Sequence, residues 1–120
     1  MINGSALPTL SRTQKRFMDE ILSTLEKILE QRKSATSDNS YVASLYSQGT
    51  DKILDIISEE SAEVIKAAQD EGNDKIIHEV ADLWFHTLVL LRHKNISIKE
   101  IETELIRRFG ISGHTEKAVR

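Results

Sequence analysis

The chain has 120 residues, a formal net charge of −3, no cysteine and 29% charged residues. This length suits one domain with a single core, and the acidic balance disfavours a nucleic-acid role based on a basic surface. The lack of cysteine excludes disulfides and thiolate metal sites and suits a reducing cytosol. We find no signal-peptide pattern, and the longest apolar stretch, 83–91, is too short to span a bilayer. A cytoplasmic protein that does not enter the membrane is expected.

The first third of the chain predicts a tail, a helix and a polar loop. Residues 1–12 carry turn-forming residues and little periodicity, so we expect a flexible N-terminal tail there, and one all-α domain over residues 13–120. Apolar residues at helical spacing predict a first helix from near Thr13 to about Arg32. A polar loop over 33–40 follows.

The middle of the chain predicts two long helices that pack side by side. A short apolar segment, 41–46, ends at Gly49, after which Thr50 or Asp51 can cap a helix that reaches about residue 70. A turn at Gly72 leads into a third long helix, expected over about 73–94. Such a short turn makes the two long helices antiparallel neighbours.

The last predicted helix runs from Ile98 to about Phe109. Asn95 can cap the end of the preceding helix, and Ser97 with Glu100 has the spacing of a capping box. We find no useful stretch with the two-residue alternation of a strand. The predicted fold is therefore an all-α bundle of four to five helices with two long central antiparallel helices, completed by dimerisation.

Two pairs of acidic residues are the most informative feature of the sequence. Each pair has i,i+3 spacing and shares one face of its helix: Glu60 with Glu63, and Glu79 with Asp82. Glu60 interrupts an apolar helical stripe that consists of Ile53, Ile57, Val64 and Ala67. Carboxylates that point into a bundle are unfavourable unless positive charge meets them.

The two pairs are expected at the same level of the helical hairpin. Glu63 lies about ten residues before the turn and Asp82 about nine after it, so at about 1.5 Å per residue the pairs reach similar heights. Either pair alone is more simply explained as a solvated helix face. Both pairs at one level favour a cation site.

Carboxylate oxygens alone favour Mg²⁺, with Mn²⁺ as a substitute, over zinc. Because Mg²⁺ keeps open positions for water and phosphate oxygens, chemistry on a polyphosphate is expected. A weaker alternative is a zinc site formed by His78, Asp82 and His86, at i, i+4 and i+8. His86 is equally well explained as a core histidine with a satisfied ring, or as a residue that supports Asp82.

Several further segments agree, in order, with one known family. They are Arg32-Lys33, Ser40-Tyr41, Gly49-Thr50-Asp51-Lys52, Ala81-Asp82-Leu83-Trp84-Phe85-His86 and Ser112-Gly113 to Glu116-Lys117-Ala118 through Arg120. With the E-x-x-E and E-x-x-D pairs, these segments resemble the phosphoribosyl-ATP pyrophosphohydrolase family, within the all-α MazG-like nucleoside triphosphate pyrophosphohydrolases. The resemblance covers roughly residues 22–120.

The resemblance implies a hydrolase of the histidine biosynthesis pathway. It implies Mg²⁺-dependent cleavage of the α–β phosphoanhydride of phosphoribosyl-ATP, giving phosphoribosyl-AMP and pyrophosphate, the second step of that pathway. It also implies a homodimer with active sites near the subunit interface. Apolar residues on more than one helix face, as in 83–91, independently favour a homodimer.

Each predicted site residue can be given a role in this chemistry. The metal ligands would be Glu60, Glu63, Glu79 and Asp82, and Glu59 is the candidate to activate or orient the attacking water. Candidates for substrate contacts are Lys52, Arg32, Lys33, Ser40, Lys117 and Arg120. A solvated surface role is the simpler alternative for the basic residues, and Ser40 could instead seat the connecting segment.

Two other functions stay open at this point. A house-cleaning pyrophosphatase that acts on dUTP or damaged nucleotides would share the acidic pairs. A non-catalytic helical interaction module would carry them as solvated residues, or as ligands of structural Ca²⁺. The module predicts that Glu60 and Asp82 are exposed.

Overall fold

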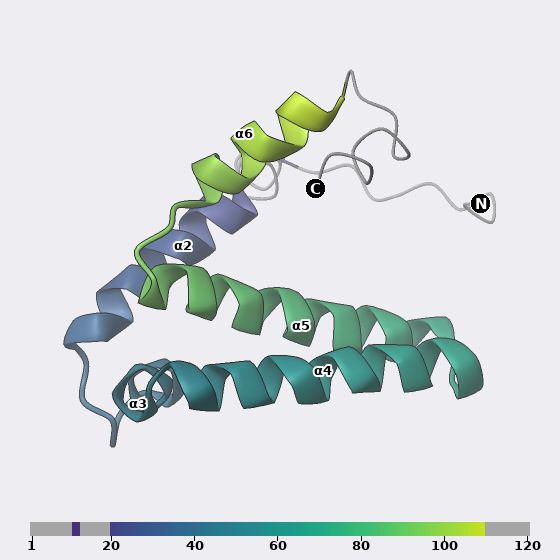
Figure 1. The fold of residues 1–120 in the computed structure, drawn as a ribbon, viewed down its shortest axis with the longest axis horizontal. Coiled ribbons are helices and arrows are strands. Elements are labelled where there is room, and N and C mark those ends of the chain that lie inside the picture. The colour runs from purple at the N-terminus through teal and green to yellow at the C-terminus, as the bar shows by residue number, and fades with distance from the viewer. Residues whose placement is uncertain (1–10, 13–19, 110–120) are drawn as a thin grey trace.

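The computed structural model describes residues 11–12 and 20–109, and all of its longer elements are α-helices (Figure 1). In chain order the elements are α2 (Ile21–Gln31), the short 3-10 helix η1 (Arg32–Ser34), α3 (Tyr41–Gln48), α4 (Thr50–Asp70), α5 (Asn73–His93) and α6 (Ile98–Arg108). The predicted all-α class is confirmed. Within the described ranges, no helix is long and apolar enough to cross a membrane. The predicted start of the first helix, Lys117 and Arg120 lie outside the described residues.

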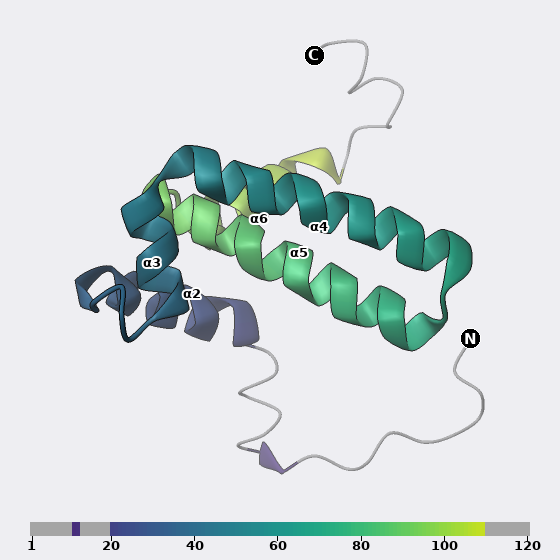
Figure 2. The ribbon, with the colours of Figure 1, turned by 90° about the horizontal axis from the view of Figure 1, so that it is seen from below.

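Helices α4 and α5 form the long antiparallel hairpin that the sequence predicts (Figures 1 and 2). The chain reverses through Glu71 and Gly72, both in extended conformations. The predicted cap of α4 is wrong by a residue, because neither Thr50 nor Asp51 is the N-cap. Gly49 takes that place with φ 93°, a backbone conformation that glycine adopts without a side-chain clash.

The apolar core lies where α2, α3, α4 and α5 meet, at the end of the hairpin away from its turn (Figure 1). Each helix contributes a large side chain that is at most 1% exposed: Leu29, Leu45, Ile53 and Val89. Burying one such side chain contributes about 1.5–3 kcal/mol. The core therefore fixes one end of the hairpin, and the half that contains the turn extends away from it.

The connection between α5 and α6 is held by local hydrogen bonds. Asn95 has φ 60°, and the Ile96 N–H donates to the Leu91 carbonyl at 2.8 Å, which is a Schellman end to α5. Ser97 and Glu100 form the predicted capping box at the start of α6. These local bonds explain why the sequence predicts both ends well.

Arg92 joins this connection to α2. Its guanidinium donates to the Glu30 carboxylate at 2.9 Å and to the Ile96 carbonyl at 2.7 Å. The Ile98 N–H donates to the Glu26 carboxylate at 2.7 Å. Charged groups thus fix α2 against the end of α5 and the start of α6.

Candidate metal centre

The two acidic pairs lie on α4 and α5, the two helices of the hairpin, and differ in burial. Glu79 is buried, with only 5% of its surface exposed. The Glu60 side chain is 19% exposed and that of Asp82 40%, whereas Glu63 is exposed. Burial of Glu79 and partial burial of Glu60 remove these carboxylates from the class of freely solvated surface residues.

Electrostatics relate the four carboxylates to one another. Burial raises the pKa of Glu60, and the neighbouring Asp82, Glu79 and Glu63 carboxylates raise it further, while His86 acts in the opposite direction. Glu60 is therefore within electrostatic reach of the other three predicted ligands. A cluster of this kind favours binding of a cation or a proton.

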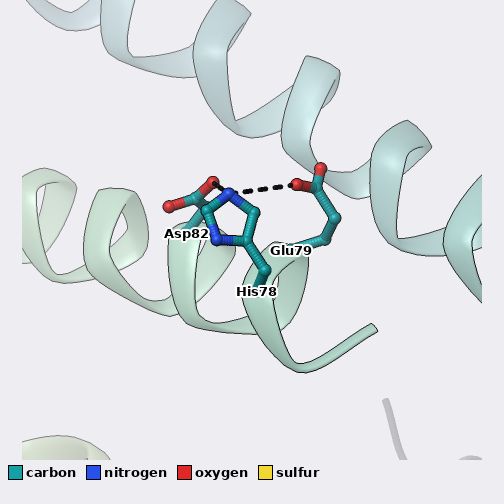
Figure 3. A group of neighbouring side chains, drawn as sticks. All are labelled: His78, Glu79 and Asp82. Atoms are coloured by element: carbon teal, nitrogen blue, oxygen red, sulfur yellow. Dashed lines mark ion pairs between the residues drawn. The ribbon is translucent and has the colours of Figure 1, made fainter. Parts of the chain in front are cut away.

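Within the part of the chain that the structure describes, the group of side chains close enough to share one metal ion is not the predicted set of four carboxylates. It consists of His78, Glu79 and Asp82, whose donor atoms lie within 4.8 Å of one another. His78 Nε2 lies 3.6 Å from Glu79 Oε1 and 3.3 Å from Asp82 Oδ2 (Figure 3). Lys75 adds its ammonium 3.8 Å from Glu79 Oε1. Two basic side chains of α5, Lys75 and His78, thus lie within 4 Å of predicted ligands on the same helix.

His86 does not join this group, so the zinc trio considered from the sequence is not assembled. Its Nδ1 lies 2.9 Å from the Asp82 backbone carbonyl, and its Nε2 lies 2.8 Å from the Tyr41 hydroxyl. Both ring nitrogens are therefore engaged. The ring is 7% exposed, which agrees with the alternative of a core histidine whose hydrogen bonds are satisfied.

Two of the predicted substrate contacts border one cavity of about 380 Å³. Arg32 and Ser40 line it together with Tyr41 and Phe85. Ser40 is also the N-cap of α3, because its hydroxyl accepts from the Ala43 N–H at 3.1 Å. Of the residues that line this cavity, Tyr41 also feels the acidic cluster, because its phenol pKa is raised by burial and by the nearby Glu60, Asp82 and Glu59 carboxylates.

The other predicted residues occupy different surroundings. Lys33 donates to Asn95 Oδ1 at 2.8 Å and pairs with Glu30 at 3.3 Å. Lys52 is exposed in the first turn of α4. Glu59 is exposed beside Glu60, close enough to the Tyr41 phenol to raise its pKa. Their roles in catalysis and substrate binding stay predictions.

The sequence did not indicate the contact between Tyr41 and His86. These residues are 45 positions apart, and no local pattern pairs them. The one available signal was the spacing of His86, four residues after Asp82, which places it one helical turn further along the same face.

The all-α fold, with a long hairpin that carries carboxylates on both of its helices, agrees with the all-α pyrophosphohydrolases that the sequence resembles. The chain belongs to the phosphoribosyl-ATP pyrophosphohydrolase family, whose model matches residues 22–109.

Relatives named phosphoribosyl-ATP pyrophosphatase match most of the chain. That of Vesicomyosocius okutanii is 69% identical over 86% of this chain and 98% of its own. The Hydrogenovibrio crunogenus relative is 52% identical over 85% and 94%, and that of Neisseria meningitidis serogroup B is 46% identical over 85% and 95%.

Proposed function

We propose that this chain hydrolyses the α–β phosphoanhydride of phosphoribosyl-ATP to phosphoribosyl-AMP and pyrophosphate, the second step of histidine biosynthesis. The observation that carries this proposal is 69% identity to a phosphoribosyl-ATP pyrophosphatase over 98% of that relative's length. Burial of Glu79 between two helices supports a working site over a solvated acidic face. As an enzyme of amino-acid biosynthesis, the protein would act in the cytoplasm.

We infer that Glu60, Glu63, Glu79 and Asp82 hold Mg²⁺, for which Mn²⁺ can substitute. Support comes from the donor set, which is all oxygen, and from the pKa of Glu60, which is raised first by burial and then by the neighbouring carboxylates. When bound, Mg²⁺ would neutralise the negative charge that develops on the phosphate oxygens and on the leaving pyrophosphate. The His78 side chain is 64% exposed, so it can turn into solvent at little cost.

The protein's own side chains account for the remaining tasks. Water cleaves the anhydride: its oxygen forms a bond to one phosphorus while the bond from that phosphorus to the bridging oxygen breaks. The bridging oxygen leaves with the other phosphorus, and the second proton of water passes to the leaving group or to solvent. Glu59, at the edge of the cluster, would orient this water. Arg32 and Ser40 would hold the substrate in the cavity that they share, and Lys52 would contact phosphate from the start of α4. Lys117 and Arg120 stay predictions for the same role.

We also infer a homodimer. Large apolar side chains are exposed on the hairpin and on α6, including Ile77 at 66% and Trp84 at 59%. An apolar groove of about 440 Å³, bordered by Trp84 and Leu105 among other residues, runs between α5 and α6. Trp84→Glu should halve the mass measured by light scattering, whereas Ile106→Glu, outside the groove, should not; an unchanged Trp84→Glu mass would contradict this face.

The experiment that tests the function compares three substrates. Pyrophosphate release should occur from phosphoribosyl-ATP with Mg²⁺ and be far slower from dUTP and ATP. Preference for dUTP would keep the chemistry and replace the substrate, as in a house-cleaning pyrophosphatase. Release from none of them would favour the non-catalytic module, which the burial of Glu79 and the partial burial of Glu60 disfavour.

A further inference from the structure

A chain of hydrogen bonds leads from α3 to the acidic cluster. Tyr41 begins α3, and its hydroxyl lies 2.8 Å from His86 Nε2 on α5. His86 Nδ1 lies 2.9 Å from the Asp82 backbone carbonyl. Since a carbonyl can only accept, Nδ1 carries the proton, and Nε2 of the neutral ring accepts from the Tyr41 hydroxyl.

The fixed imidazole faces Glu60. Glu60 Oε1 lies 4.0 Å from His86 Nδ1, across the gap between α4 and α5. Phe85 packs edge-on against the ring with centroids 5.3 Å apart, and Tyr41 does so at 5.8 Å. Rotation of the imidazole would break both hydrogen bonds and disturb these contacts. The imidazole therefore keeps one orientation, with its Nδ1–H directed at the Asp82 carbonyl and Nδ1 4.0 Å from the Glu60 carboxylate.

Tyr41 contributes to this arrangement chiefly through its hydroxyl. The residue is 56% exposed, so its ring adds little to the core. Its location is set by Ser40, the N-cap immediately before it. Packing of the core therefore does not explain a tyrosine at this position, whereas the hydrogen bond from its hydroxyl to the buried His86 does.

We propose that Tyr41 and His86 are positioning residues of the metal centre, a role that rests on the proposed metal site. Tyr41 fixes the tautomer and orientation of the imidazole, and the fixed imidazole edge, 4.0 Å from Glu60, limits where that carboxylate of α4 can lie relative to Asp82 on α5. Neither residue is a metal ligand in this proposal. Partners that orient metal ligands in this way commonly change metal affinity when they are removed.

A second tyrosine–histidine pair provides a matched control. Tyr46 of α3 stacks on His93 of α5, with centroids 5.9 Å apart, and its hydroxyl donates to the Leu29 carbonyl at 2.9 Å. His93 lies seven residues beyond His86, about 10 Å further along the helix axis. Tyr46→Phe therefore removes a hydrogen bond of similar length that joins α3 to α2, away from the four predicted metal ligands.

The test measures Mn²⁺ dissociation constants by electron paramagnetic resonance, and Tm without metal. We expect Tyr41→Phe to weaken Mn²⁺ binding about tenfold, and Tyr46→Phe to lower Tm with little change in Mn²⁺ affinity. His86→Asn keeps a donor for the Asp82 carbonyl but loses Tyr41. Combining it with Tyr41→Phe should then add little to either single loss.

Two results would overturn the positioning role while leaving the metal site intact. One is an unchanged Mn²⁺ affinity in Tyr41→Phe, in a protein whose Mn²⁺ binding is lost in Glu60→Gln. The other is an additive loss in the double variant. If the unaltered protein binds no Mn²⁺ that Glu60→Gln removes, the proposed metal site fails and the positioning role fails with it.

Discussion

His78 and Asp82 are one turn apart on α5, and His78 Nε2 lies 3.3 Å from Asp82 Oδ2. His78 can therefore add a nitrogen donor to a site whose other donors are carboxylate oxygens. Zinc binds imidazole readily, whereas Mg²⁺ and Mn²⁺ favour carboxylates.

The His78→Gln variant separates these preferences. Because our account gives the metal to carboxylates, Mn²⁺ affinity should change by less than about threefold, while Zn²⁺ affinity should fall by about tenfold or more. Calorimetric titration with each metal measures both. A large loss of Mn²⁺ affinity would instead make His78 a ligand of the working metal.

Glu60→Gln should stabilise the metal-free protein near neutral pH. The pKa of Glu60 is raised, first by burial and then by Asp82. The folded state thus holds the proton more tightly than the unfolded state, and ionisation above the ordinary pKa of 4.5 reduces stability as pH rises through the folded pKa. We expect Tm to rise by about 2–5 °C at pH 7, a free-energy change below about 1 kcal/mol.

The same comparison at low pH provides the control. Below the unfolded pKa both states hold the proton, so the gain in Tm should vanish there. Added Mn²⁺ should raise Tm of the unaltered protein and have little effect on Glu60→Gln. A Tm gain that is independent of pH would mean that the ionisation of Glu60 is not what destabilises the metal-free protein.

Arg32→Ala should weaken substrate binding more than Lys33→Ala does. Arg32 borders the cavity that Tyr41 also lines, whereas the Lys33 ammonium is bonded to Asn95 and Glu30. Loss of a hydrogen bond to a charged phosphate, about 1.5–3 kcal/mol, should raise KM for phosphoribosyl-ATP about tenfold or more. Steady-state kinetics of both variants measure it, and equal effects would remove the cavity from the substrate site.

The sequence was sufficient for the fold because its helix ends are encoded locally. Ser97 and Glu100 form the predicted capping box, and Gly72 marks the predicted turn. The start of α4 was less accurate, because Gly49 at positive φ caps a helix without a side-chain acceptor. Such a cap leaves no distinct pattern in the sequence.

For the site, the i,i+3 spacing places each acidic pair on one helix face, but it does not predict the depth of each carboxylate. Glu79 is buried and Glu63 is exposed, because depth depends on how the two helices are rotated against each other. The contact between Tyr41 and His86 depends on the path of the whole chain between them. Long-range geometry of this kind could not be read from the sequence.

The most direct test of the central claim is pyrophosphate release from phosphoribosyl-ATP by Glu79→Gln across a range of Mg²⁺ concentrations. Glu71→Gln is the control, since Glu71 is an exposed carboxylate at the hairpin turn. We expect Glu79→Gln to lose about 10²-fold or more of the rate, with Glu71→Gln unaffected. Full activity of a folded Glu79→Gln protein would contradict an active site between α4 and α5.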